Sequence, residues 1–532
     1  MDVRAALDEW RSLLGGGQVL DGEAAARDYG ADTGGAARRI SGALRILDSA
    51  TLPAVMRIAQ RHGTPVYPIS TGHNWGYGTA LPVKDDCAII DLSALQRILH
   101  FDAELGVVTV EPGVTQGMLA DFLDQGGHDY MVPTTGAGPT CSLMGNALER
   151  GYGITPHADH FGAVTDIEAV LADGTVYRTA LRVLAGDDLA RLFKWGIGPY
   201  TAGLFAQSGF GIVTRMTIML ARRPECVKVC LFSLRDDALL EPAVERVQHL
   251  LTTLPGIVGG LNLMNRHRVL AMTAPYPADR LGPDGLIPED VIQALGRQYQ
   301  ILPWTGFGTL YGTRRVVAAA QKEIRRALRG IAARLLFLSP DHARTLARAA
   351  TWLPGRIGTR LSRTASTLAD SLELVVGRPN ETALPLAYWR NDSGHHASPR
   401  DPARDGCGLL WYAPLVPMRP RGVRAYVEMM KRCTTSHGLE PLVTFTSISN
   451  KLFDSTAPLL FNRADPAAAA RAHACFDDLL AQGRTLGCFP YRVGIESMGH
   501  IGRPEGSPPG LHELLTTKLA RGPLAPARYG AT

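Results

Sequence analysis

The sequence predicts an α+β fold in which two differently organised parts follow one another. Residues 53–62 carry apolar side chains at three- and four-residue spacing, which is typical of an amphipathic helix. Residues 166–177 contain two β-prone runs joined by Asp173-Gly174, a dipeptide that favours a hairpin turn. From about Cys226 the pattern changes, and residues 227–234 alternate with the period of two that indicates a half-buried strand.

In the first part, helices and strands alternate along the chain. An amphipathic helix is expected over 1–14, and Gly63 should end the helix that covers 53–62. Thr115 is placed to cap a helix over 116–126, because its hydroxyl can accept a hydrogen bond from the first turn. Strands are expected at 65–67, 87–92 and 106–114.

In the second part, strands and helices again follow one another along the chain. Helices are expected at 241–254 and 314–335, and strands at 227–234, 304–313, 411–415 and 442–446. Gly306-Phe-Gly308 is not a dinucleotide-binding fingerprint, because the third glycine falls one position late and no acidic partner follows at the usual distance.

Length and composition indicate a globular enzyme of two or three domains. The chain has 532 residues, of which 45% are apolar and 20% charged, with a net charge of +5 and dispersed arginines, so nothing indicates nucleic-acid binding. The eight cysteines include no Cys-x-x-Cys pair, and neither a metal site nor a disulfide framework is expected. No window approaches the roughly 18 apolar residues of a membrane span. The opening helix lacks the apolar core of a signal peptide, so we expect a cytoplasmic protein.

Three glycine-rich stretches are the strongest functional signal, and they lie at 68–80, 133–161 and 198–214. Glycine lets the backbone take positive φ and turn its amides inward, so the first stretch can wrap an anion such as a pyrophosphate. A plain connector could also be rich in glycine. However, the first stretch also contains His73, Asn74, Trp75 and Tyr77, which are unusual in a simple turn.

In the same order, these three stretches resemble the corresponding segments of the vanillyl-alcohol oxidase and p-cresol methylhydroxylase family of FAD flavoenzymes. The resemblance extends over nearly the whole chain. It implies a p-cresol methylhydroxylase-type FAD-binding domain of two α+β subdomains over 1–225 and an inserted antiparallel cap domain that binds substrate over 226–484. Residues 485–532 would return to the active site. A homodimer is also implied, with O2 or another molecule as the electron acceptor.

The resemblance further implies which residues bind FAD. They are Ser70, Thr71, Gly72, His73, Asn74, Gly76, Thr135, Gly136, Gly145, Asn146, Gly151, Gly211, Ile212, Val213 and Arg528. Arg528 lies in a C-terminal run similar to the family's Ala-Pro-Gly-Arg motif, with Ala527 in place of glycine, and would stabilise the anionic reduced flavin. His73 matches a histidine that berberine bridge enzymes bond covalently to the flavin, whereas Leu409 stands where vanillyl-alcohol oxidase has its bonding histidine. Covalent FAD through His73 is expected, and a histidine that only hydrogen-bonds a phosphate is the alternative.

Three residues match the family's ligands for a substrate phenolate, namely Tyr77, Tyr491 and Arg492. Taken alone, Tyr491-Arg492 would be a strand tyrosine beside a surface arginine. Ionising a phenol of pKa about 10 at neutral pH requires about 4 kcal/mol. Charge-assisted hydrogen bonds worth about 1.5–3 kcal/mol each can supply that energy. Asp159, between His157 and His160, matches the family's active-site aspartate.

We therefore expect an FAD-dependent oxidoreductase that removes a hydride from the benzylic carbon of a para-substituted phenol and leaves a quinone methide. The alternative is a berberine-bridge-like oxidase of secondary metabolism that oxidises an alcohol or performs an oxidative cyclisation. A flavin-binding partner subunit without turnover is a third reading. Phe453-Asp454 stands where relatives carry His-His, so the cap pocket is altered and the substrate is not implied by the resemblance.

Overall fold

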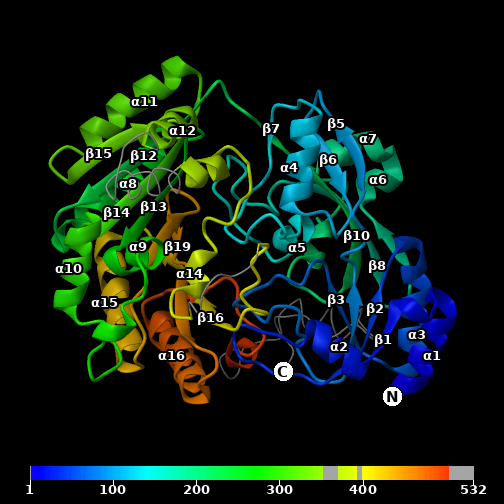
Figure 1. Ribbon diagram of the computed structural model, residues 1–532. Helices are drawn as coiled ribbons and strands as arrows, with labels where there is room; N and C mark the ends of the chain where they lie inside the picture. The colour runs from blue at the N-terminus through cyan, green and yellow to red at the C-terminus, as the bar shows by residue number, and fades with distance from the viewer. Residues whose placement is uncertain (1, 351–368, 392–397, 502–532) are drawn as a thin grey trace.

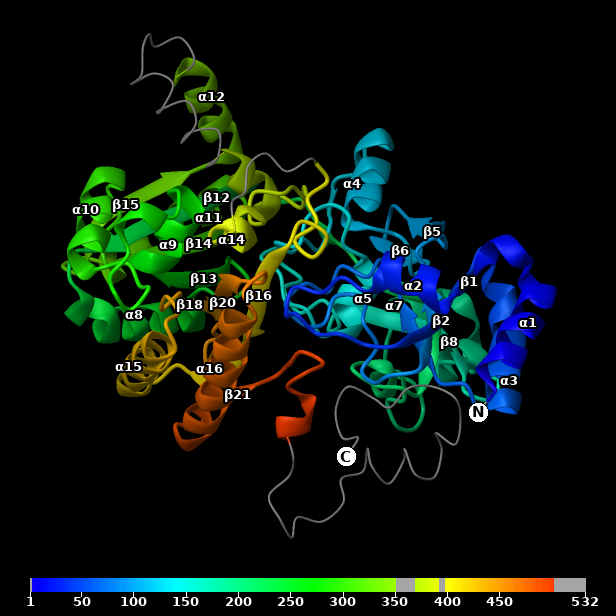
Figure 2. The same cartoon turned by 60° about the horizontal axis from the view of Figure 1, so that its bottom comes forward.

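The computed structural model describes residues 2–350, 369–391 and 398–501. Figure 1 shows the elements of the first 222 residues, in blue and cyan, on one side of the molecule. The elements from β12 (Cys226–Leu234) onward, in green to orange, lie on the other side (Figures 1 and 2). The helix α14 (Pro385–Tyr388) and the strand β16 (Cys407–Tyr412) lie toward the middle in both views. None of the helices in the described ranges combines the length and apolar character needed to cross a lipid bilayer.

The first sheet has four strands in the order β1-β2-β4-β3. Its strands are β1 (Val19–Asp21), β2 (Ile40–Arg45), β3 (Val66–Ile69) and β4 (Cys87–Asp91). Every residue of β4 is buried, as expected for a strand that pairs in parallel with β2 and β3 and is covered on both faces. The helices α1 (Val3–Leu14), α2 (Gly22–Tyr29) and α3 (Leu52–His62) accompany this sheet. Since β3 ends at Ile69, the sheet fixes the start of the first glycine-rich stretch.

The second sheet has five antiparallel strands in the order β5-β6-β10-β8-β9. They are β5 (Ile98–Asp102), β6 (Val107–Val110), β8 (Val164–Leu171), β9 (Val176–Arg178) and β10 (Gly211–Met219). As predicted, Asp173 and Gly174 form the turn between β8 and β9, with Gly174 at a φ of 84°. Thr115 caps α4 (Gln116–Gln125) by accepting a hydrogen bond from the Met118 amide at 3.2 Å. The other elements of this part are β7 (Tyr130–Met131), α5 (Leu143–Leu148), α6 (Ala180–Ala185), α7 (Asp187–Leu192) and β11 (Ala221–Arg222).

The third sheet has eight strands in the order β15-β12-β14-β13-β18-β19-β17-β21. Besides β12 they are β13 (Val258–Asn265), β14 (Trp304–Gly312), β15 (Ala332–Leu338), β17 (Pro414–Pro417), β18 (Thr444–Ser447), β19 (Leu452–Asp454) and β21 (Phe489–Pro490). The helices of this part are α8 (Leu240–Thr253), α9 (Arg266–Thr273), α10 (Glu289–Tyr299), α11 (Arg314–Ala327), α12 (Pro340–Ala350), α15 (Pro420–Ser436) and α16 (Pro466–Thr485). A large apolar core that includes Trp304, Tyr426 and Phe445 packs between sheet and helices.

Two predictions for this part are corrected. The helix expected over 314–335 ends at Ala327, because Gly330 takes a φ of 81° and the apolar run after it pairs with β12 as the edge strand β15. Residues 411–415 are not one central strand. Trp411 belongs to β16, which pairs with β20 (Ala457–Asn462) in a separate two-stranded sheet, whereas Leu415 belongs to β17 near the edge of the third sheet.

The chain crosses from the third sheet to the first glycine-rich stretch just after β21. That short strand pairs with β17, so residues 489–490 still belong to the third sheet. Five residues later, the Ile495 amide donates a hydrogen bond to the Tyr77 carbonyl at 3.3 Å. Tyr491 and Arg492 lie between these two attachments, and their positions are therefore fixed from both sides.

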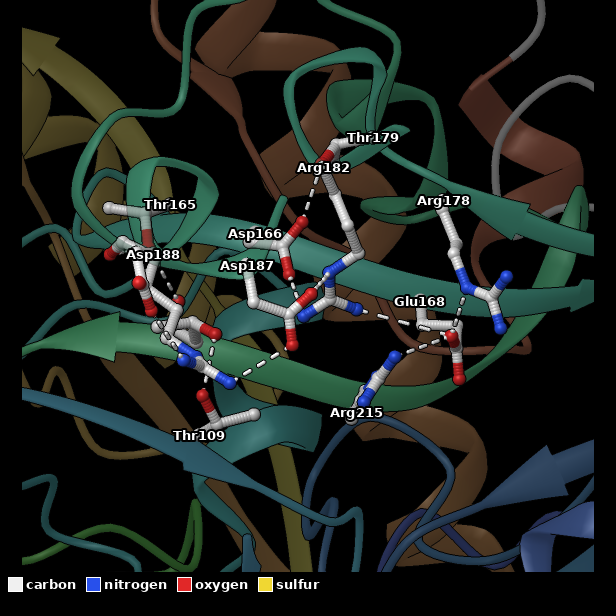
Figure 3. A network of polar contacts seen from close by, with 12 residues as sticks. Thr109, Thr165, Asp166, Glu168, Arg178, Thr179, Arg182, Asp187, Asp188 and Arg215 are labelled. Carbon is white, nitrogen blue, oxygen red and sulfur yellow. Dashed lines mark hydrogen bonds and ion pairs between the residues drawn. The ribbon is translucent and has the colours of Figure 1, made fainter. Parts of the chain in front are cut away.

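A buried ionic network supports the second sheet, from which the third glycine-rich stretch continues into β10. Arg182 of α6 is buried and lies 2.6 Å from Asp166 of β8 and 3.0 Å from Asp187 (Figure 3). The Thr179 hydroxyl donates to the other oxygen of Asp166 at 2.5 Å. Glu168 of β8 accepts from Arg215 of β10 at 2.7 Å, which connects the network to the strand that carries residues 211–213.

We expect Arg182→Met to destabilise the fold by about 3–5 kcal/mol, because it leaves the Asp166 carboxylate buried without its cation. Urea unfolding followed by circular dichroism measures this loss. Arg178→Met is the matched control, since Arg178 pairs with Glu168 but its side chain is 52% exposed, and the loss should stay below about 1 kcal/mol. Equal losses in the two variants would contradict the assignment.

Candidate active site

A cavity of about 470 Å³ lies where segments that are far apart in the sequence meet. Its wall includes residues from all three glycine-rich stretches, from α14 and β16, and from the tail after β21. The volume falls in the range of small-molecule and cofactor sites. Most of the lining residues are apolar, and the charged ones among them are Glu149, Arg268, Asp454 and Arg492.

The first two glycine-rich stretches approach each other so closely that side chains larger than hydrogen would collide. A β-carbon on Gly145 of α5 would lie 2.4 Å from the Ser70 hydroxyl, and one on Gly151 would lie 2.3 Å from the Asn146 amide. Gly72 takes a φ of 69°, which favours glycine. These positions form a narrow cradle that only backbone atoms and small side chains line, which suits the close approach of a flat ring system.

Of the fifteen residues predicted to bind FAD, thirteen line the cavity. They are Ser70, Thr71, Gly72, His73, Asn74, Thr135, Gly136, Gly145, Asn146, Gly151, Gly211, Ile212 and Val213. Gly76 lies behind the wall, where its amide donates to the Thr33 hydroxyl at 2.7 Å and the Trp411 ring packs against it. Arg528 and the motif around it lie outside the described residues.

His73 lines the cavity and has one ring nitrogen without a hydrogen-bond partner among the described residues. Its ring stacks on Trp75 with the centroids 5.0 Å apart, and the Trp75 indole donates to Asp401 at 3.2 Å. The Nδ1 atom is buried and has no hydrogen-bond partner among the described residues. Burial lowers the pKa of His73, so the imidazole is neutral at neutral pH. Leu409 lines the same cavity and offers no atom for a covalent bond.

The three residues predicted to hold a phenolate come together at the wall. The Arg492 guanidinium lies over the Tyr77 ring, 4.1 Å from its centroid, and donates a hydrogen bond to the Asn74 side chain. Tyr491 packs edge-on against Tyr152, with ring centroids 5.8 Å apart. All of these side chains line the cavity. Burial raises the pKa of Tyr491 well above its usual value, so its hydroxyl remains a hydrogen-bond donor.

Asp454 is a buried carboxylate beside this cluster, and the resemblance placed it at the altered cap pocket without giving it a role. It ends β19, is 3% exposed, and accepts a hydrogen bond from the Tyr491 hydroxyl at 3.5 Å. Burial raises the pKa of Asp454 to about 7, against the opposing effects of Tyr491 and Arg492. The available signal was the replacement of His-His by Phe453-Asp454. It could not be used because a strand residue's partner across the cavity is not visible in sequence.

The structure places Asp159 outside the cavity lining. Its side chain is exposed and accepts a hydrogen bond from the Gly162 amide at 2.8 Å, which is the role of a turn-capping residue. His160 is buried, and its Nδ1 lies 2.5 Å from the Asn146 side-chain oxygen, so it positions a residue of the wall. Burial lowers the pKa of His157, and that of His160 to about 4, which leaves both rings neutral at neutral pH.

Three further lining residues were missed from the sequence, namely Glu149, Tyr152 and Arg268. Glu149 Oε2 lies 3.5 Å from Arg492 Nε, so it partly balances that charge. Glu149 and Tyr152 flank Gly151 and could have been found from that neighbourhood. No local motif surrounds Arg268. Within the described ranges, no group of three or more His, Cys, Asp or Glu residues is placed to hold a metal ion.

Comparison with known proteins agrees with this geometry. Residues 42–180 match a protein family described as an FAD binding domain. The chain is 32% identical over 507 residues to 1'-carboxy-chondrochloren decarboxylase of Chondromyces crocatus. The aligned region covers 95% of this chain and 93% of the relative. The chain is also 27% identical over 512 residues to the flavoprotein subunit of the hydroxylating 4-cresol dehydrogenase of Pseudomonas putida. This aligned region covers 95% of this chain and 91% of that subunit.

Two solved structures match along nearly the whole chain. p-Cresol methylhydroxylase with substrate bound superposes with a TM-score of 0.85 at 25% identity, covering 98% of this chain and 96% of that chain. 4-Ethylphenol oxidase from Gulosibacter chungangensis, in complex with isoeugenol, superposes with a TM-score of 0.81 at 25% identity. The match covers 93% of this chain and 90% of that chain. The α+β architecture with its antiparallel cap sheet is therefore the one predicted from the sequence.

We expect Asp454→Asn to remove a pH-dependent loss of stability. Burial raises the pKa of Asp454 to about 7, whereas an unfolded aspartate has a pKa of about 3.9. Between these values the folded protein keeps a proton that the unfolded chain has lost. This group's contribution to stability is therefore complete below about pH 4, declines as the pH rises, and is lost above about pH 7.

Urea unfolding of the wild type and the variant at about pH 5 and about pH 8 measures this effect. The wild type should lose more stability than Asp454→Asn between the two conditions. Asp121→Asn, at an exposed position of α4, is the control and should behave like the wild type. If Asp454→Asn also behaved like the wild type, the buried carboxylic acid would not be titrating as described.

Proposed function

The chain belongs to the p-cresol methylhydroxylase and vanillyl-alcohol oxidase family of FAD-dependent oxidoreductases, and we propose that it oxidises a para-substituted phenol at the benzylic carbon. The observation that supports the substrate class is the meeting of Tyr77, Tyr491 and Arg492 at the wall of the cavity. The two named relatives that act on a cresol or an ethylphenol point to the same chemistry.

These three residues would hold the substrate as its phenolate. A guanidinium and two hydroxyl donors favour the ionised oxygen, since charge-assisted hydrogen bonds are worth about 1.5–3 kcal/mol each. Asn74 and the Tyr77 ring hold the Arg492 guanidinium in place, so little side-chain freedom remains to be lost on binding. Glu149 near the same guanidinium limits the positive charge of the site when no substrate is present.

Asp454 would accept the proton that the phenol loses. Its carboxylate already accepts a hydrogen bond from Tyr491, so the substrate proton can pass to the Tyr491 oxygen while the Tyr491 proton passes to Asp454. The pKa of about 7 suits an acceptor at neutral pH. The relay leaves Tyr491 protonated, and its hydroxyl donates to the phenolate that it has helped to form.

The phenolate then drives the oxidation. Electron density from the ionised oxygen reaches the para carbon and weakens the benzylic C–H bond. Bound FAD supplies the two-electron acceptor that takes the hydride. The substrate is left as a quinone methide, to which water can add. Tyr152, which packs against Tyr491, together with Phe205 and Trp411, would provide apolar surface for the substrate, since all three line the cavity.

The thirteen lining residues fit FAD, and we propose that they hold it within residues 1–225, with the cap over 226–484 and the tail over 485–532 closing the site. His73 would bond the flavin through its unpartnered Nδ1 atom, and Arg528 would lie beside the reduced ring. We further propose a cytoplasmic homodimer with O2 or another small molecule as the electron acceptor.

A second candidate is oxidative decarboxylation, which the name of the Chondromyces crocatus relative favours. If the carbon next to the benzylic carbon carries a carboxylate, the quinone methide can accept the electron pair of the C–COO⁻ bond. CO2 then leaves, and the product is a 4-hydroxystyryl compound. Release of CO2 with a styryl product, rather than addition of water, distinguishes this outcome. A berberine-bridge-like cyclisation becomes the better hypothesis if no simple phenol reduces the flavin.

We expect the acid-precipitated holoprotein to remain yellow, because a flavin bonded to His73 cannot leave a denatured chain. His73→Ala should release all of the yellow colour into the supernatant while the folded variant still binds FAD. Absorbance of pellet and supernatant is the measurement. Yellow colour in the supernatant of the wild type would contradict the covalent bond.

We expect Arg492→Met to lower kcat/KM for 4-alkylphenols by about 10- to 150-fold, the loss of one charge-assisted hydrogen bond. Anaerobic flavin reduction by 4-ethylphenol and 4-hydroxybenzyl alcohol, followed in a stopped-flow instrument, is the measurement. Arg471→Met on the exposed face of α16 is the control. Unchanged kinetics in Arg492→Met, with FAD still bound, would remove the phenolate hypothesis.

A further inference from the structure

We propose that Arg268 binds a carboxylate on the side chain of the substrate, so that the substrate is a para-substituted phenol with an anionic tail. This inference rests on the proposed oxidation of phenols and defines a second binding group in the same cavity. It concerns a residue of the third-sheet part of the chain, whereas the phenolate ligands come from the first stretch and the tail.

The backbone around Arg268 is held firmly. Asn265 caps α9 by accepting a hydrogen bond from the Arg268 amide at 3.0 Å, and the Asn265 side chain also bonds the backbone of residues 441 and 443. Leu270 of the same helix belongs to an apolar cluster with Leu384 and Leu409, which line the cavity. Arg268 itself lines that cavity, at the capped first turn of the helix.

The Arg268 side chain has no counter-charge among the described residues. Its Nε and Nη1 atoms are buried without a hydrogen-bond partner, and no carboxylate there lies within ion-pair distance. Burial lowers the pKa of Arg268 to about 10, so it remains protonated at neutral pH. A buried cation without a partner costs several kcal/mol, and proteins normally pair such groups.

The other charged residues of the wall are already engaged. Arg492 contacts Asn74 and Glu149, and Asp454 accepts from Tyr491. Among the described residues that line the cavity, Arg268 is therefore the guanidinium that has no hydrogen-bond partner and no counter-charge. The glycine cradle of the first two stretches suits the flavin diphosphate, whereas Arg268 comes from α9, in the part of the chain that forms the third sheet. A planar carboxylate matches the two parallel donors of a guanidinium.

The test compares acids with neutral analogues of the same shape. The holoenzyme is titrated anaerobically with (4-hydroxyphenyl)alkanoates of increasing chain length and with the corresponding primary amides. Binding is read from the change in the flavin absorption spectrum, and flavin reduction is timed separately. Wild type, Arg268→Gln, Arg268→Lys and the control Arg266→Gln are compared. Arg266 lies on the same helix and does not line the cavity.

The wild type should bind the best acid about 10- to 100-fold more tightly than its amide. Arg268→Gln should abolish that preference without changing the affinity for the amide, Arg268→Lys should restore part of it, and Arg266→Gln should keep all of it. If acids bind with this preference but no phenol reduces the flavin, the oxidation proposal fails and the carboxylate site stands.

Three results would overturn the carboxylate site. The wild type could show no preference for acids over amides. Arg268→Gln could lower the affinity for acids and amides equally, or it could lose FAD, which would assign the guanidinium to the cofactor.

The thermal unfolding midpoint gives an independent test. Removal of an unpaired buried charge should raise the midpoint of Arg268→Met, whereas loss of a structural arginine would lower it.

Discussion

The contact between Arg492 and the first glycine-rich stretch is the interaction on which the rest of the site depends. A guanidinium over the Tyr77 ring and a hydrogen bond to Asn74 join the tail of the chain to a loop near its beginning. The edge strand β21 delivers the tail from the third sheet, and the Ile495 amide anchors it to Tyr77. This wall of the cavity therefore depends on how the third sheet is held against the loop that follows the first sheet.

Charge is distributed over this wall in an uneven manner. Around Arg492, the positive group is balanced by Glu149, an amide oxygen and an aromatic face, and Asp454 holds its proton until about neutral pH. Around Arg268, nothing among the described residues provides a balance. A fold can tolerate a buried cation without a counter-charge at one place when a bound molecule supplies the missing negative charge. Charged groups in unfavourable surroundings therefore concentrate in binding sites.

Local features were predictable because neighbouring residues decide them. The cap of α4 by Thr115, the turn at Asp173-Gly174 and the glycine cradle follow from side-chain and backbone preferences. The end of α11 was missed because the apolar residues after Gly330 fit both a helical and a strand spacing. Their pairing with β12 makes them the strand β15. The resemblance put Asp454 at the cap pocket without a role, and Arg268 was not found, since the contacts of both arise from strands and helices that meet only in the folded protein.

The position of β21 has a consequence for how the enzyme is made. Residues 489–492 leave the ribosome after all three glycine-rich stretches and all the other strands of the third sheet. The cradle for the cofactor can therefore be complete while the substrate side of the cavity still lacks its last wall. Among the described residues, Tyr491 and Arg492 are therefore the last part of the cavity wall to be synthesised.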